Sequence, residues 1–334
     1  MKLLAIALSS SVLVACGGGG GGTSTAPLPT APTAVLNSSN QNVAAEDAAS
    51  TAFMPMLGAQ TLTGAQTTDE TALFSIAREQ MAKLPAYMAD AKAESALTGV
   101  VQSQTAACPL GGSLTVSVND ADNNGVLSAD DSLTIVSNSC VLSAGTTTGS
   151  LGFVINTVAG NYQSPTSTNY TLGVTMNFGN FTVTTPGLVA SVNGSLSLTA
   201  AANGVNTLDE TISTPSLTMA GTYGGVTRSR SLTNYGATAS RVPTANSYQT
   251  SYSINATLTS TGLSSQAISV ATTTAFVRQS TDVYPSSGVM LLTDSSKAKL
   301  KLTALSNTQV KEELDANGDG LYESNTTVNW TSLM

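Results

Sequence analysis

Hydrophobic and polar residues alternate along most of the chain from about residue 112 onward. Leu114, Val116 and Val118 are separated by Thr115 and Ser117. The same period of two recurs in later runs, at residues 133–136, 171–177, 181–183, 188–198, 216–223, 253–258, 268–277, 289–292, 299–305, 309–314 and 326–330. A period of two is typical of strands with one buried face, and the breaks between runs are rich in Gly, Asn, Pro and Ser.

No helical interval separates these runs, so the pattern favours an antiparallel meander over alternating strands and helices. Ten or more such strands must twist and curl. We therefore expect a mainly β protein, in which the meander forms a curved sheet, an open barrel or a sandwich with an N-terminal helical segment packed on it.

The pattern changes to a helical period over residues 67–97. Thr67 and Glu70 form a capping box, and Pro85 ends or kinks the helix. One face carries the apolar residues Leu73, Ala77, Met81 and Leu84. Such a stripe is far more often core packing than a partner surface, so we expect this helix, within a helical segment at 41–110, to lie against the sheet.

The start of the chain has the pattern of a secretory signal peptide. Lys2 gives a basic start, and a short apolar run ends in Leu13-Val14-Ala15-Cys16. Twelve residues of helix span only about 18 Å, whereas a bilayer core is roughly 30 Å thick, which argues against a transmembrane helix. An ordinary cleaved signal is the other alternative, but it would not need a Cys at the cut.

With Cys directly after Leu-Val-Ala, this segment resembles the lipobox of bacterial lipoproteins. The resemblance implies cleavage before Cys16, a diacylglyceryl thioether on its sulfur, and an acyl chain such as palmitate on its amine. Gly17 follows where lipoproteins of the inner membrane often carry Asp. The resemblance therefore implies an anchor in the outer membrane, with the protein facing the periplasm or the cell surface.

Six glycines and then Pro27, Pro29 and Pro32 follow the lipobox. A chain of this composition is a tether that reaches roughly 25–30 Å. The expected organisation is a signal peptide at 1–15, a lipidated Cys and flexible tether at 16–40, a helical segment at 41–110 and an antiparallel β domain at 111–334.

Composition narrows the chemistry. Ser and Thr account for 92 of 334 residues and charged residues for 10%. There is no His, which excludes Ser-His-Asp and Cys-His catalysis and His-containing metal sites. Acidic residues outnumber basic ones by 20 to 12, and no basic cluster extends beyond Arg228 and Arg230, so a nucleic-acid partner is not expected.

With Cys16 lipidated, Cys108 and Cys140 remain as a pair in an oxidising compartment. We expect them to form a disulfide. Two unrelated buried thiols are the alternative.

Residues 120–131 resemble the twelve-residue calcium loop of EF-hand and dockerin proteins. Oxygen donors stand at positions 1, 3, 5, 9 and 12, Gly125 stands at position 6, and position 7 offers its carbonyl. The resemblance implies calcium as a cofactor, held by Asp120, Asp122, Asn124, Val126, Ser128 and Asp131. It covers only these residues, and a strand follows in place of the family's helix. A solvated turn without metal is the alternative.

A hairpin closed by this loop has a defined register. Its expected cross-strand pairs are Asn119 with Ser132, Val118 with Leu133, Val116 with Ile135 and Leu114 with Ser137. Continuing that register places Gly111 opposite Cys140, within reach of Cys108. One cation would then hold the closed end of the hairpin and one disulfide its open end.

A second, shorter version of the loop spans residues 315–323. Its candidate ligands are Asp315, Asn317, Asp319, Leu321 and Glu323, but position 12 is Thr326, which cannot supply a bidentate carboxylate. Asp319-Gly320 is also a good hairpin turn without metal, so calcium and a plain turn are equally supported here.

The sequence predicts no enzyme. The adjacent acid pairs Asp209-Glu210 and Glu312-Glu313 fall in strands, where neighbours point to opposite faces, and we expect solvated surface acids there. The favoured function is a lipid-anchored, non-catalytic β domain that binds or presents a glycan or another protein. A carrier of lipids or other hydrophobic ligands is the alternative, and a carbohydrate-active hydrolase with two carboxylates is the third.

Overall fold

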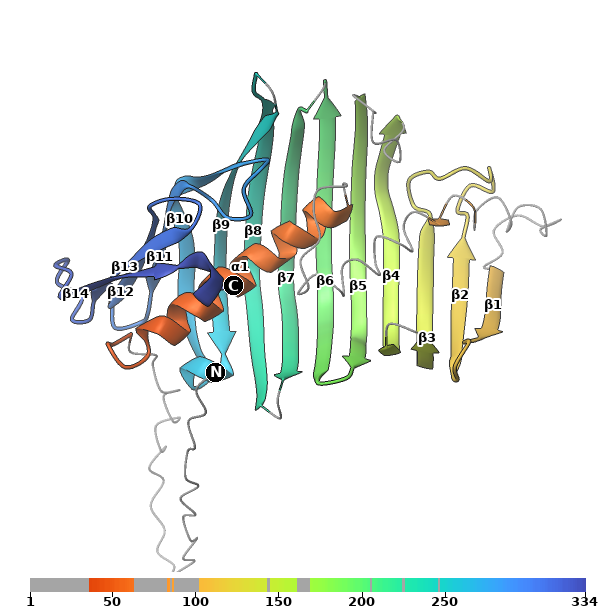
Figure 1. Cartoon of the computed structure of the whole chain (residues 1–334). Helices are drawn as coiled ribbons and strands as arrows, with labels where there is room; N and C mark the ends of the chain where they lie inside the picture. Colours follow the sequence, from red (N-terminus) through yellow and green to blue (C-terminus); the bar gives the residue numbers. More distant parts are fainter. Residues whose placement is uncertain are drawn as a thin grey trace, which may run out of the picture. The chain divides into compact units, whose positions relative to one another are not determined.

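The structure, a computed structural model, describes residues 36–62, 83–84, 86, 102–142, 145–160, 169–204, 206–223, 226–245 and 247–334. Fourteen strands form one antiparallel sheet, and each strand pairs with its neighbours in sequence (Figure 1). The strands are β1 (Gln102–Ala107), β2 (Ser113–Asn119), β3 (Ser132–Leu142), β4 (Gly145–Gly160), β5 (Asn169–Thr185), β6 (Leu188–Asn203), β7 (Leu208–Tyr223), β8 (Val226–Pro243), β9 (Tyr248–Ser260), β10 (Gln266–Gln279), β11 (Ser287–Thr293), β12 (Lys299–Ala304), β13 (Gln309–Asp315) and β14 (Ser324–Asn329).

The predicted antiparallel meander is confirmed, and the sheet is open, because β1 and β14 are its two edges. The predicted runs at 171–177 and 181–183 belong to one strand, β5, whose register shifts between Phe178 and Phe181. Asn180 has a positive φ of 47° at this bulge. An extra residue in one strand reverses the alternation after it, which is why the sequence reads as two short strands.

Three strands were not predicted from the alternation. β4 and β8 are rich in Gly, Thr, Ser and Arg, which weakens the apolar signal. β1 lies inside the segment expected to be helical, and its sequence, Gln-Ser-Gln-Thr-Ala-Ala, alternates no apolar residues. Pairing with β2 in a regular register is what makes it a strand.

The described α-helix, α1, spans Gln41–Leu62. The helix predicted at 67–97 lies outside the described residues except at Lys83, Leu84 and Ala86, which are helical, with Leu84 buried. Two short 3-10 helices follow β9 and β14, at Thr261–Leu263 and Trp330–Ser332.

Helix α1 lies against β7, β8 and β9 on one face of the sheet (Figure 1). Phe53 anchors it there, because its ring packs edge-on against Tyr252, Phe276 and Trp330, with centroid distances of 5.6, 5.3 and 6.1 Å. Edge-to-face packing of buried rings stabilises by about 0.5–1.5 kcal/mol per pair beyond the area buried. The hydroxyl of Tyr235 adds a hydrogen bond to the carbonyl of Ala52.

Polar contacts hold the other end of α1. Asp47 is fully buried and pairs with Nε of Arg230 at 2.6 Å, and the hydroxyl of Ser260 donates to its second oxygen. Just before the helix, the backbone N–H of Leu36 donates to the carboxylate of Asp294 at 2.7 Å. The helix is thus fixed to the sheet by specific side chains and not only by apolar contact.

Candidate metal sites

The first acidic loop closes the hairpin of β2 and β3 in the predicted register. The four predicted cross-strand pairs, from Asn119–Ser132 to Leu114–Ser137, are all present. Because the register is set by apolar residues on one face, the chain between the strands is left with the twelve residues 120–131. The acidic residues therefore gather at the end of a well-ordered hairpin.

Asp120 and Asp131 form the buried floor of this loop. Asp120 accepts hydrogen bonds from the N–H of Asn124 at 3.1 Å and of Gly125 at 2.7 Å. Asp131 accepts from the N–H of Ala121 at 2.9 Å. Gly125 has a φ of 71°, a conformation that favours glycine and turns the loop back on itself.

Asp122 completes the cluster from the exposed side. One oxygen from each of Asp120, Asp122 and Asp131 lies within 4.8 Å of the others. Desolvation raises the pKa of Asp122, but hydrogen bonds from Asn124, together with those involving Asp120 and Ser128, outweigh it and lower the pKa overall. The carboxylate therefore stays ionised, the form that binds a cation.

The second acidic loop connects β13 and β14 and repeats this pattern. The N–H of Gly320 donates to Asp315 at 3.0 Å, as that of Gly125 does to Asp120. The N–H of Leu321 donates to Asp319 at 2.8 Å, as that of Val126 does to Asn124. The residues at loop positions 1, 5, 6 and 7 thus play matching roles in the two loops.

Glu323 replaces the missing position 12 of the second loop. It accepts the N–H of Ala316 at 2.8 Å, the equivalent of the amide that Asp131 accepts in the first loop. Its oxygen lies within 4.8 Å of those of Asp315 and Asp319. Thr326 instead lies in β14, directly opposite Glu312 of β13. Judging the loop by its residue at position 12 missed this carboxylate, because the longer side chain of Glu323 at position 9 reaches the place that an Asp at position 12 takes in the first loop.

Both clusters can hold a metal ion. Each brings together three carboxylates, and hard cations such as calcium prefer oxygen ligands. Each loop is followed by a strand, whereas a helix follows the calcium loop of EF-hands and dockerins.

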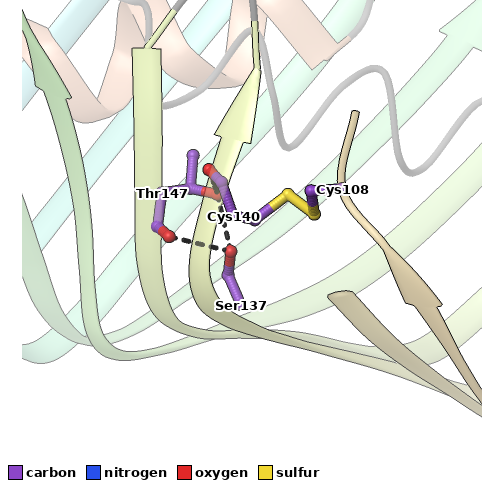
Figure 2. Close-up of a disulfide and its surroundings, with 4 residues drawn as sticks. All are labelled: Cys108, Ser137, Cys140 and Thr147. Carbon is purple, nitrogen blue, oxygen red and sulfur yellow. Dashed lines mark hydrogen bonds between the residues drawn. A yellow bond between two sulfur atoms is a disulfide. The ribbon is translucent and has the colours of Figure 1, made fainter. Parts of the chain in front are cut away.

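Cys108 and Cys140 are joined in a disulfide, with Cα atoms 5.4 Å apart (Figure 2). The register differs by one residue from the expected one, because Gly111 pairs with Val141 through a backbone hydrogen bond of 2.9 Å. Ser139, with a φ of 49°, is the extra residue. Beside the bond, the hydroxyls of Ser137 and Thr147 are 2.6 Å apart and buried (Figure 2).

Two of the acids expected on the surface are buried. Glu210 lies on the inner face of β7, the face of the sheet on which α1 lies, whereas Asp209 is exposed on the opposite, outer face. Glu312 lies under the start of α1, where Nε2 of Gln41 donates to it at 3.2 Å. Burial raises the pKa of Glu312, and the hydrogen bond from Gln41 partly offsets this. The alternation of the sequence predicted that neighbouring acids point to opposite faces of the sheet. It did not predict that α1 covers Glu312.

The hollows among the described residues include a groove and a cavity. A shallow groove of about 550 Å³ crosses the outer face of β3 to β7, with Gly152, Gly179 and Gly194 in its floor. A cavity of about 180 Å³ lies next to the disulfide, between Leu114, Ile135 and Phe181 among others.

The chain shows no significant match to a known protein family, to a curated protein or to a solved structure. No helix in the described part of the chain is both long enough and apolar enough to cross a membrane. Cys16 and the lipobox lie outside the described residues.

Proposed function

We propose that the protein is a lipoprotein of the outer membrane, anchored through Cys16, whose β domain is not catalytic and binds an uncharged glycan. Calcium in the two acidic loops and the disulfide stabilise this domain. The tether would let the sheet face the periplasm or the cell surface while staying near the membrane.

The outer face of the long strands carries the proposal. Thr199, Thr211, Thr238 and Ser253 stand directly opposite one another on β6, β7, β8 and β9. The three threonines are exposed. Neighbouring strands lie about 4.8 Å apart, so the row offers hydroxyls at that spacing.

A second row runs beside the first and consists of Ser197, Ser213, Gly236 and Asn255. On the other side of the first row, Asp209 contributes a carboxylate. Side chains that donate and accept hydrogen bonds, with little charge, match the hydroxyls of a neutral sugar polymer better than a charged partner. The glycine-floored groove on the same sheet face gives a polymer a place to lie.

The carrier of hydrophobic ligands is supported by the apolar cavity beside the disulfide. Its volume of about 180 Å³ is below the roughly 300–1,000 Å³ of most small-molecule sites. That difference favours the glycan proposal.

Calcium binding is tested by thermal unfolding of residues 17–334 with 1 mM calcium or with EDTA. Dissociation constants of about 10⁻⁴–10⁻³ M would stabilise the domain by roughly 0.4–1.4 kcal/mol per site. Asp122→Ala should remove the part of the calcium-dependent stabilisation that the first loop contributes. Asp130→Asn is the matched control, because it removes a neighbouring charge and Asn tolerates the positive φ of that position. An equal melting temperature with and without calcium would exclude the ion.

Glycan binding is tested by retention of the same protein on beads of dextran, mannan or cellulose. Thr211→Glu, in the centre of the hydroxyl row, should abolish retention by placing a charge there. Thr327→Glu, on the exposed edge strand β14, is the control for the added charge. Retention on none of the three polymers, or retention that Thr211→Glu leaves intact, would contradict the proposal.

A further inference from the structure

A second group of polar residues lies on the face of the sheet that α1 covers. Arg241 on β8 stands directly opposite Thr250 on β9, and Thr250 stands directly opposite Arg278 on β10. Residues opposite each other share a face, and Tyr252, two positions after Thr250, contacts Phe53 of α1. The three residues therefore form a row beside the aromatic cluster of α1.

Two polar atoms of this row lack partners. Thr250 is 2% exposed, and its hydroxyl makes no hydrogen bond within the described part of the chain. Nε of Arg241 is also buried and makes none. A buried donor without an acceptor is unfavourable, and because these two stand on facing residues, one acceptor can serve both.

The surroundings of the row are charged and aromatic. The guanidinium of Arg241 lies 4.3 Å from the ring centre of Tyr248. Burial raises the pKa of Tyr170, the charge of Glu210 raises it further and that of Arg241 lowers it, so both charges lie near this ring. Burial also raises the pKa of Tyr252, and Arg278 partly offsets the rise.

Glu210 and Arg278 each make contacts of their own, so the open donors are those of Arg241 and Thr250. Arg278 is 5% exposed, whereas Arg241 and Tyr248 are partly exposed. A ligand would therefore enter from the side of Arg241.

We infer that this row binds an oxyanion, the carboxylate or phosphate group of a ligand, with Nε–H of Arg241 and the hydroxyl of Thr250 as donors. A guanidinium offers donors in a planar fork that matches both groups, and such charge-assisted bonds are about twice as strong as neutral ones. Arg278 stands on the far side of Thr250. The ring of Tyr248 holds the guanidinium of Arg241 in place.

The site is tested by isothermal titration of residues 17–334 with inorganic phosphate and with D-galacturonate, which distinguish the two sources of the anion. Methyl galactoside is the neutral control. Saturable binding of at least one anion is expected. Arg241→Gln should weaken it by about tenfold or more. Arg241→Lys should also weaken it, because Lys keeps the charge but lacks the Nε–H fork.

Arg228→Gln is the matched control, because it removes the same charge from the same strand at an exposed ion pair with Glu46. Its affinity should equal that of the unchanged protein. Circular dichroism and melting temperature show that each variant is folded, and Thr250→Val tests the hydroxyl separately. The inference fails if neither anion binds, or if Arg228→Gln weakens binding as much as Arg241→Gln does.

Discussion

Removal of the disulfide tests how much the open end of the β2–β3 hairpin depends on a covalent link. Cys108 and Cys140 are 32 positions apart, and the bond ties the chain after the edge strand β1 to β3. The loop-closure relation gives −2.1 − 1.5R ln 32, or about −12.4 cal/mol/K, which is about 3.7 kcal/mol at 25 °C. At roughly 2 °C per kcal/mol for a domain of this size, the melting temperature should fall by about 7 °C.

The assay is calorimetric unfolding of Cys108→Ala, of Cys140→Ala and of the double variant, with the unchanged protein oxidised and reduced. Either single variant breaks the link, so each should lose almost as much stability as the double variant. Cys140 is buried, so its variant should lose slightly more through the small void it leaves. Two single losses that add up to the double loss, or a reduced protein as stable as the oxidised one, would refute the entropic reasoning.

Further predictions concern the anchor and the helix contacts. Asp47→Ala should lower the free energy of unfolding by about 3 kcal/mol in urea titrations, because it removes the buried carboxylate that Nε of Arg230 donates to and leaves Arg230 only its longer, partly exposed pair with Glu46 at 3.6 Å. Phe53→Ala should cost about 3–5 kcal/mol in the same assay. Burial raises the pKa of Glu312, so the folded protein becomes less stable as the pH rises from the ordinary pKa of a Glu through the raised one. Glu312→Gln should therefore unfold at a higher temperature at pH 7 but not at pH 3. Cys16→Ser should abolish metabolic labelling with palmitate and leave an uncleaved precursor, and continued labelling would contradict the anchor.

The alternation of single residues was enough to predict the meander and the register of its first long hairpin. A slip of one residue would move Val116 and Val118 off the buried face that they share with Ile135 and Leu133. The calcium-like spacing at 120–131 predicted which carboxylates would converge, since that chemistry is local. Strands without apolar alternation, such as β1, could not be found in this way.

What the sequence alone determined is therefore local: the period of two, the turn residues between strands and the carboxylate spacing within one loop. The tertiary structure decided what depends on distant segments meeting. Only the packing of α1 on the sheet buries Glu312 and pairs Asp47 with Arg230 across 183 positions. Only the joint register of β8, β9 and β10 aligns Arg241, Thr250 and Arg278, because cross-strand neighbours are set by the whole sheet and leave no mark in any one strand.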